Sequence, residues 1–274
     1  MSFDFWFLKF GGLTNFSDKP EVNYKNISKQ NPFAGRFETS EEKKNYVLNL
    51  FSSIPNHYDH MNRVMSLGLD MNWRRKSIRL ANFKKDGLLL DLATGTGDMI
   101  IAAEHHLPEV KIVGLDFCEP LMRIAQDKIN GKFNQHQVNW IQGDALELPF
   151  ADNSYDGAFT AFALRNVISV KQAFAELYRV IRSGGKVVSL EMVKQSNRVR
   201  RKIFSFYFSQ IIPRLGRWLT AYPDAYSYLP LSIENFYTAD ELTDLIASVG
   251  WKNVQHHPLM FQNVAIHVGV KLSG

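Results

Sequence analysis

The chain has 274 residues, of which 45% are hydrophobic and 22% charged, and this balance suits a globular domain with a full core. Its single cysteine, Cys118, excludes an internal disulfide framework and a cysteine-based zinc site. The eight histidines show no H-E-x-x-H spacing, so we expect no metal site. A net charge of +5 favours anionic partners, such as nucleic acid, a phospholipid surface or an anionic substrate, without choosing among them.

The first 40 residues predict an extension that precedes the main domain. Residues 1–10 are aromatic but carry Asp4 and lack a basic start, so they fit a secretory signal poorly. They either anchor at a membrane surface or pack on the domain. Residues 11–40 are rich in Gly, Asn, Ser, Lys and Pro, which is typical of an irregular linker. We expect one domain over 41–274, located in the cytoplasm or peripherally at the inner face of a membrane.

The hydrophobic pattern then predicts helices and strands in a regular order. A helix starts at Glu41 and reaches Pro55, and a second polar–apolar segment continues to Trp73. Strands and helices alternate from there, with the strands expected at 88–93, 110–115, 138–141, 155–162 and 186–193 and the helices at 99–107, 119–130 and 168–181, before a turn at 184–185. The C-terminal part predicts a helical region at 199–219, a helix opened by a capping box at 238–241 and ended at 250, and a strand at 264–270.

Alternating strands and helices with short connections predict an α/β fold. We expect a Rossmann-like, mostly parallel, seven-stranded sheet with helices on both faces. In such sheets ligands bind at the carboxyl ends of the strands.

The sharpest local motif is DLATGTGD at 91–98, between a predicted strand and a predicted helix. Gly95 and Gly97 permit a tight turn and close approach of a ligand to the backbone, and Thr96 lies between them. The third glycine of the dinucleotide fingerprint is replaced by Ile100. Acidic residues at both ends, Asp91 among them, would repel a pyrophosphate but not the ammonium and sulfonium of S-adenosylmethionine. We therefore expect S-adenosylmethionine, with an NAD or FAD protein as the alternative.

Two further acids follow predicted strands. Asp116 ends the second strand and can accept both hydroxyls of a ribose. Asp144, with Ala145 after it, follows the third strand, where the adenine would lie and a carboxylate can accept from the exocyclic amine. The loop and these two acids together predict a cofactor site.

Ordered motifs over about residues 45–271 resemble the ubiquinone/menaquinone biosynthesis C-methyltransferases, a family of class I S-adenosylmethionine-dependent methyltransferases. The matching segments are 58–62, 65–68, 73–74, 90–98, 143–150, 154–156, 164–167, 179–185, 190–191, 226–230 and 232–233. The tetrapeptide Leu-Arg-Asn-Val at 164–167 is distinctive of the family. The resemblance implies a class I methyltransferase fold and methylation of a ring carbon of a polyprenyl quinol precursor. Residues 1–44 have no counterpart in it.

The resemblance also implies catalytic roles for Arg165, Asn166 and Tyr58. A hydroquinone carbon is nucleophilic only after a neighbouring hydroxyl loses its proton, so a base and a stabiliser of phenolate are needed. Arg165 stays protonated and suits the stabiliser, although a structural salt bridge is its alternative role. Asn166 could position the hydroxyl or a water, and Tyr58 could close the pocket. The base is not assigned.

Two positions and one segment depart from the family pattern and bear on which quinone head group is bound. Ala161 replaces a serine that is a cofactor contact in relatives, and Ala163 replaces a glycine. The segment 260–264 replaces a small, glycine-containing turn and is a candidate border of the substrate.

A lipophilic quinol would place the enzyme at a membrane. Four basic residues within 198–202, followed by an aromatic run at 203–208, then predict a face for an anionic bilayer. The alternative is a core helix with a solvated basic end. For assembly, a homodimer is one option that the sequence leaves open.

Other functions remain as alternatives. A nucleic-acid methyltransferase would suit the basic charge, but residues 162–166 lack the Asn/Asp-Pro-Pro-aromatic motif and Cys118 does not follow a proline, so we expect no nucleic-acid partner. A methyltransferase of another small phenolic or secondary-metabolite substrate is the main competitor. A non-catalytic scaffold in a quinone-biosynthesis assembly is the third.

Overall fold

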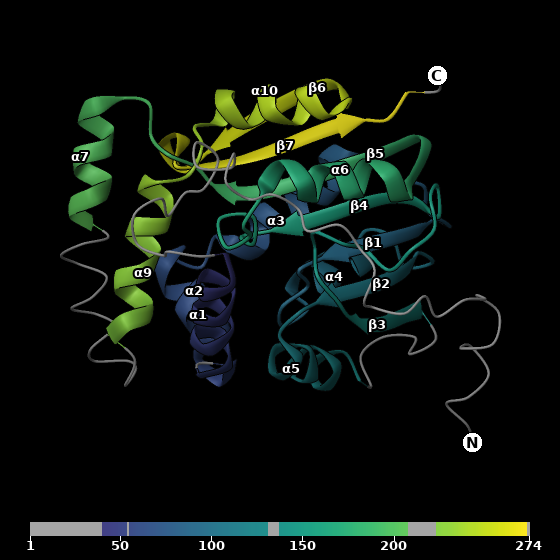
Figure 1. Ribbon diagram of the computed structural model, residues 1–274, viewed down its shortest axis with the longest axis horizontal. Coiled ribbons are helices and arrows are strands. Elements are labelled where there is room, and N and C mark those ends of the chain that lie inside the picture. The colour runs from purple at the N-terminus through teal and green to yellow at the C-terminus, as the bar shows by residue number, and fades with distance from the viewer. Residues whose placement is uncertain (1–39, 54, 131–136, 208–222, 273–274) are drawn as a thin grey trace.

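The computed structural model describes residues 40–53, 55–130, 137–207 and 223–272. Their strands form one seven-stranded sheet in the order β3-β2-β1-β4-β5-β7-β6 (Figure 1). The five strands from β3 to β5 run parallel, and β7 pairs antiparallel with both β5 and β6. The strands are β1 Leu88–Leu92, β2 Lys111–Asp116, β3 Val138–Gln142, β4 Tyr155–Ala161, β5 Ile181–Met192, β6 Lys252–Leu259 and β7 Val264–Val270. The predicted fold class is confirmed.

Helices cover both faces of the sheet and the edge where the parallel strands end (Figure 1). They are α1 Ser40–Ser53, α2 Pro55–Met65, α3 Asp70–Ala81, α4 Asp98–Glu104, α5 Glu119–Ile129, α6 Val170–Val180, α7 Arg198–Phe206, α9 Pro223–Glu234 and α10 Ala239–Val249, with a short 3-10 turn, η4, at Met260–Gln262. Among the described residues, no helix combines the length and the apolarity needed to cross a bilayer.

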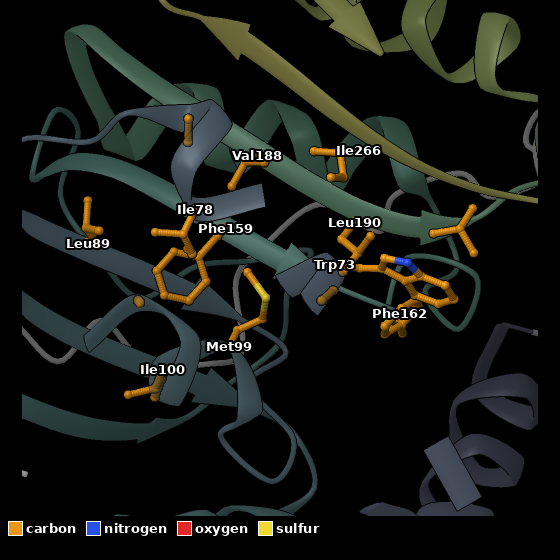
Figure 2. Packing of buried hydrophobic residues seen from close by; sticks show 14 of the residues in the cluster. Trp73, Ile78, Leu89, Met99, Ile100, Phe159, Phe162, Val188, Leu190 and Ile266 are labelled. Carbon is orange, nitrogen blue, oxygen red and sulfur yellow. The ribbon is translucent and has the colours of Figure 1, made fainter. Parts of the chain in front are cut away.

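Two apolar layers form because neighbouring strand residues point to opposite faces. Leu89 belongs to the layer under α3 and α4, and Leu90 to the layer under α6 and α10. Figure 2 shows the first layer, where Phe159 of β4 lies near Ile78 of α3 and Met99 of α4. Each strand in the middle of the sheet is therefore buried on both sides, which explains its nearly continuous apolar sequence.

Three features of the structure differ from the sequence predictions, and one prediction is tested only in part. The segment after Pro55 forms two helices, because Leu67 and Gly68 adopt left-handed backbone angles between them. No turn separates α6 from the fifth strand: β5 starts at Ile181, and residues 182–185 bulge from its ladder with β4. The strand β6 was missed because it is polar and contains Pro258, which an edge strand tolerates. Of the predicted helical region 199–219, α7 ends at Phe206, and 208–222 lies outside the described residues, as do residues 1–39.

The capping box is confirmed, since the side chains and backbone of Thr238 and Glu241 bond reciprocally at the start of α10. The strand order around β1 matters for function. The chain first adds β2 and β3 on one side of β1 and then β4 and β5 on the other side. This reversal of strand order opens a crevice at the carboxyl ends of the strands.

Candidate functional site

A pocket of about 810 Å³, counted with its opening to solvent, lies at this reversal point. Its floor is formed by the residues that end β1, β2 and β4, and its cover by α1. The lining residues that carry the argument below are Gly95, Asp116, Asp144, Ala145, Phe162 and Asn166.

The loop after β1 is shaped by left-handed backbone angles at three positions, Ala93, Gly95 and Gly97. A Cβ on Gly95 would meet no atom within 4 Å, so this glycine faces open space. A Cβ on Gly97 would lie 3.0 Å from Cβ of Ala125 on α5, so this glycine lets helix and loop pack closely. The two predicted glycines therefore have different roles: Gly95 leaves room for a ligand, and Gly97 allows the loop to pack closely against α5.

Asp116 ties the loop to the end of β2. Its Oδ2 accepts from the Gly95 N–H at 2.7 Å, and its Oδ1 accepts from the Cys118 N–H at 2.8 Å. Burial raises the pKa of Asp116 to about 6, although these N–H donors oppose the shift. A buried carboxylate at the pocket wall is suited to accept hydroxyl donors from a ligand.

Asp91 lies behind the loop and does not line the pocket. Its Oδ2 accepts from the Thr94 hydroxyl at 2.6 Å, while its buried Oδ1 has no hydrogen-bond partner among the described residues. Burial raises the pKa of Asp91 to about 8, against the hydrogen bond from Thr94 and the charge of Arg74. The orphaned oxygen is the kind of buried acceptor that a ligand donor or a water would satisfy.

The opposite wall carries Asp144 and Ala145. Asp144 Oδ2 accepts from Lys44 Nζ of α1 at 2.8 Å, and its Oδ1 accepts from the Leu146 N–H at 2.9 Å. Lys44 also lines the pocket, so this ion pair joins α1 to the pocket wall that carries Asp144. The sequence did not single out Lys44, because a lysine on a helix usually points to solvent.

An ionic network holds α2 against the loop, and it too was missed from the sequence. Thr96, predicted as a cofactor contact, donates its hydroxyl to Asp59 of α2. Lys128 of α5 bonds both Asp59 and Asp98, at 2.6 Å each, and Arg63 of α2 bonds Asp98 at 2.9 Å. Burial alone would raise the pKa of Asp98, but Arg74, Lys128 and Arg63 outweigh it and hold that pKa below its usual value. The network therefore fixes the helix that carries Tyr58.

A second pocket, of about 590 Å³, adjoins the first and shares Phe51, Phe162 and Asn166 with it. Most of its wall is apolar. The residues lining it are Leu50, Phe51, Met61, Asn62, Met65, Ser66, Asp70, Phe162, Arg165, Asn166, Met192, Tyr228 and Leu229. The walls of both pockets are mostly apolar, and two adjoining pockets give room for two ligands side by side.

Arg165 is buried in the wall of the second pocket and forms an ion pair with Glu191 of β5. Glu191 is fully buried, and it also accepts from the N–H groups of Leu164 and Met192, at 2.8 Å each. The salt bridge expected as the alternative for Arg165 is therefore present, yet the same side chain lines the pocket. Glu191 holds the guanidinium in place.

Asn166 lies between the two pockets. Its Oδ1 accepts from the Tyr228 hydroxyl of α9 at 3.0 Å, which leaves the amide nitrogen for other partners. Tyr58 belongs to α2, but its side chain lies outside the described residues.

The predicted residues thus fall into three groups. Gly95, Asp116, Asp144 and Ala145 line the larger pocket. Arg165 lines the smaller pocket, and Asn166 lines both. Asp91, Thr96 and Gly97 line neither pocket; their contacts hold the loop in position.

The departures from the family pattern lie in different parts of the structure. Ala161 and Ala163 both line the larger pocket, so the two changes do alter its wall. The segment 260–264 lines neither of the two pockets, and its place beside the substrate stays a prediction.

The pocket residues fit S-adenosylmethionine. The loop presents Gly95 without a Cβ, and the carboxylates of Asp116 and Asp144 line the same pocket, where they could accept from hydroxyl and amine groups. Within the described ranges, no three His, Cys, Asp or Glu side chains are grouped to hold a metal ion.

Comparison with known proteins agrees with the motifs. The sequence profile described as the ubiE/COQ5 methyltransferase family matches residues 38–271. The demethylmenaquinone methyltransferase of Roseiflexus castenholzii is 40% identical over 231 residues, which cover 84% of this chain and 95% of that protein. The ubiquinone/menaquinone biosynthesis C-methyltransferase UbiE of Geobacter sulfurreducens is 35% identical over 231 residues, which cover 84% and 90%.

Solved structures show the same fold at low sequence identity. A SAM-dependent methyltransferase from Aquifex aeolicus aligns with a TM-score of 0.53 and 17% identity, over 73% of this chain and 89% of that one. The phosphoethanolamine N-methyltransferase 2 of Haemonchus contortus, solved with S-adenosyl-L-methionine, aligns with a TM-score of 0.56 and 13% identity, over 74% and 53%. The predicted resemblance is confirmed by the profile and by the relatives, and the chain belongs to the ubiE/COQ5 methyltransferase family.

Proposed function

We propose that this enzyme transfers a methyl group from S-adenosylmethionine to a ring carbon of a polyprenyl quinol precursor, in menaquinone or ubiquinone biosynthesis. The observation that carries the proposal is the pair of adjoining pockets, which share Phe51, Phe162 and Asn166. One pocket is lined by the carboxylates of Asp116 and Asp144, and the other by the guanidinium of Arg165. The names of the relatives, demethylmenaquinone methyltransferase and UbiE, support the same substrate class.

The larger pocket is the proposed donor site. Asp116 would accept the ribose hydroxyls, Asp144 the adenine amine, and the loop at Gly95 would lie along the ligand. When bound, S-adenosylmethionine supplies an electrophilic methyl group on a sulfonium. Lys44 on α1, paired with Asp144, would help to exclude water from the site.

The smaller pocket is the proposed acceptor site. Its apolar side chains, among them Met61, Met65 and Leu229, suit a quinol ring and the first part of its tail. Loss of a phenolic proton makes the neighbouring ring carbon nucleophilic, and Arg165 would stabilise the resulting phenolate. Asn166, at the junction, would orient the hydroxyl. The ring carbon would take the methyl as the methyl–sulfur bond breaks, which would leave a neutral thioether. The proton of that carbon would then pass to the former phenolate oxygen and restore the aromatic hydroquinone.

The test separates binding from turnover in the variant Arg165→Ala. We expect near wild-type affinity for S-adenosylmethionine, measured by calorimetry, and loss of methyl transfer to reduced demethylmenaquinol and related benzoquinols. Arg182→Ala is the matched control, because Arg182 pairs with Asp156 at 3.0 Å outside both pockets. Methylation by Arg165→Ala at the wild-type rate would refute the role of Arg165. Failure of the wild-type enzyme to methylate any quinol of the panel would refute the substrate class.

A further inference from the structure

Helix α7 has one face on the core and one face in solvent. Phe204 and Tyr207 pack against the apolar layer under α3. Val199, Ile203 and Phe206 are 67%, 66% and 61% exposed. Positions separated by four and then three residues share one face of a helix, so these three side chains form a continuous ridge. An apolar row of this kind on a water-exposed helix indicates a binding surface.

The same helix is strongly basic. It carries Arg198, Arg200, Arg201 and Lys202 and no acidic residue. Lys202 follows Val199 by three residues and precedes Phe206 by four, so it flanks the apolar ridge. Arg201 instead turns to Glu234 at the end of α9, with 3.8 Å between charged atoms. Exposed apolar side chains bordered by cations match the boundary between phosphates and acyl chains in a bilayer.

A second exposed aromatic residue lies next to the start of α7. Phe261, in the turn η4, is 83% exposed, and its neighbours Met260 and Gln262 also have positive φ angles. Such backbone conformations are costly for non-glycine residues and persist where the surroundings enforce them. The buried Gln195 donates to the Phe261 carbonyl at 2.9 Å and accepts from the Asn197 N–H at 3.1 Å. Asn197 caps α7, so one side chain holds the turn and the helix together.

The position of α7 relates this surface to the acceptor pocket. In Figure 1 α7 stands at the end of the molecule beside α9. Tyr228 and Leu229, near the middle of α9, line the acceptor pocket. A helix pair therefore connects the exposed ridge with that pocket.

We propose that α7 and the η4 turn form a docking surface for an anionic phospholipid bilayer, through which a membrane-embedded quinol reaches the acceptor pocket. The second half of this statement rests on the proposed function; the docking itself rests on the ridge of Val199, Ile203 and Phe206 and on the charges around it. The ridge would enter the headgroup region and the cations would lie against lipid phosphates.

The test is flotation of the full-length protein with phosphatidylglycerol/phosphatidylcholine vesicles, compared with pure phosphatidylcholine. One variant replaces the ridge with serine (Val199→Ser, Ile203→Ser, Phe206→Ser). A second removes three charges (Arg198→Gln, Arg200→Gln, Lys202→Gln) and keeps the pair of Arg201 with Glu234. The matched control is Leu272→Ser, because Leu272 is 50% exposed just beyond β7.

The wild-type protein and the control should bind the anionic vesicles, and less well the neutral ones. The charge variant should lose affinity on the order of a hundredfold at low salt, since each cation near such a surface contributes roughly a fivefold gain. The ridge variant should lose binding to both vesicle types. Absence of binding by the wild type, or binding of either triple variant within about twofold of it, overturns the proposal.

A parallel assay keeps this result separate from the proposed function. Both triple variants should methylate a short-tailed, water-soluble quinol at the wild-type rate and a vesicle-embedded quinol more slowly. Vesicle binding that responds to the variants, in an enzyme that methylates no quinol, would refute the function and leave the docking surface intact. If the enzyme methylates the quinol but the variants bind vesicles as the wild type does, the docking surface is refuted and the proposed function stands.

Discussion

The variant Glu191→Gln tests how the acceptor pocket holds its cation. It removes the charge that compensates Arg165 but keeps one oxygen that can accept from a backbone N–H. Both partners are buried, and loss of one member of a buried ion pair destabilises a protein by about 3–5 kcal/mol. In a domain of this size each kcal/mol lowers the melting temperature by about 2–4 °C, so we expect a fall of roughly 10 °C.

Thermal and urea unfolding would measure the effect, with two comparisons. The double variant Arg165→Met, Glu191→Gln leaves no uncompensated charge, so it should recover at least half of the lost stability while methyl transfer stays absent. Glu119→Ala breaks an exposed pair with Arg123, at 2.7 Å, and should cost less than about 0.5 kcal/mol. The reasoning fails if Glu191→Gln costs no more than Glu119→Ala, or if the double variant is less stable than the single one.

Three further predictions concern the donor side. Burial raises the pKa of Asp116 to about 6, and on the proposed assignment the ligand hydroxyls would donate to its ionised form. Affinity for S-adenosylmethionine should therefore rise as the pH increases through 6 and then level off. Asp116→Asn should bind about ten- to a hundredfold more weakly, with a flat pH profile by calorimetry, and an unchanged profile would contradict the assignment. Gly97 and Gly184 both have a φ of +80°, so alanine is equally strained in the backbone at either position. A Cβ at Gly97 would also lie 3.0 Å from Cβ of Ala125, whereas a Cβ at Gly184 would meet no atom within 4 Å. Gly97→Ala should therefore be the less stable of the two in thermal unfolding, and equal melting temperatures would argue against close packing of the loop. Lys128→Met removes the ammonium that bridges α2 and Asp98, and should lower the free energy of unfolding by about 1–3 kcal/mol in urea titration; a loss below 0.5 kcal/mol would show that the network adds little.

Several residues that line the larger pocket could be named from the sequence because their chemistry is local. Glycines and acids at strand ends, such as Gly95 and Asp116, can be placed as soon as the strands are recognised. The ion pair of Arg165 with Glu191 could not be placed, because it joins two strand ends whose register is set only by the folded sheet. The edge strand β6 was missed for a related reason, since its pairing with β7 and not its own apolar pattern defines it.

The network around Lys128 was also beyond prediction. Charges on a helix surface are usually solvated, and nothing in the spacing of Asp59, Asp98 and Lys128 shows that three helices bring them together. The exposed ridge of α7 was only half predicted. The basic aromatic segment was recognised, but which of its side chains face the core depends on how the helix packs.

The central claim is methylation at carbon, and the most direct measurement is the position of the new methyl group. The enzyme would be incubated with reduced demethylmenaquinol and S-adenosylmethionine carrying a ¹³C-labelled methyl, and the product examined by NMR and mass spectrometry. We predict a single labelled methyl on a ring carbon, formed by the wild type and absent with Arg165→Ala. A label on a phenolic oxygen, or no labelled quinol at all, would contradict the account.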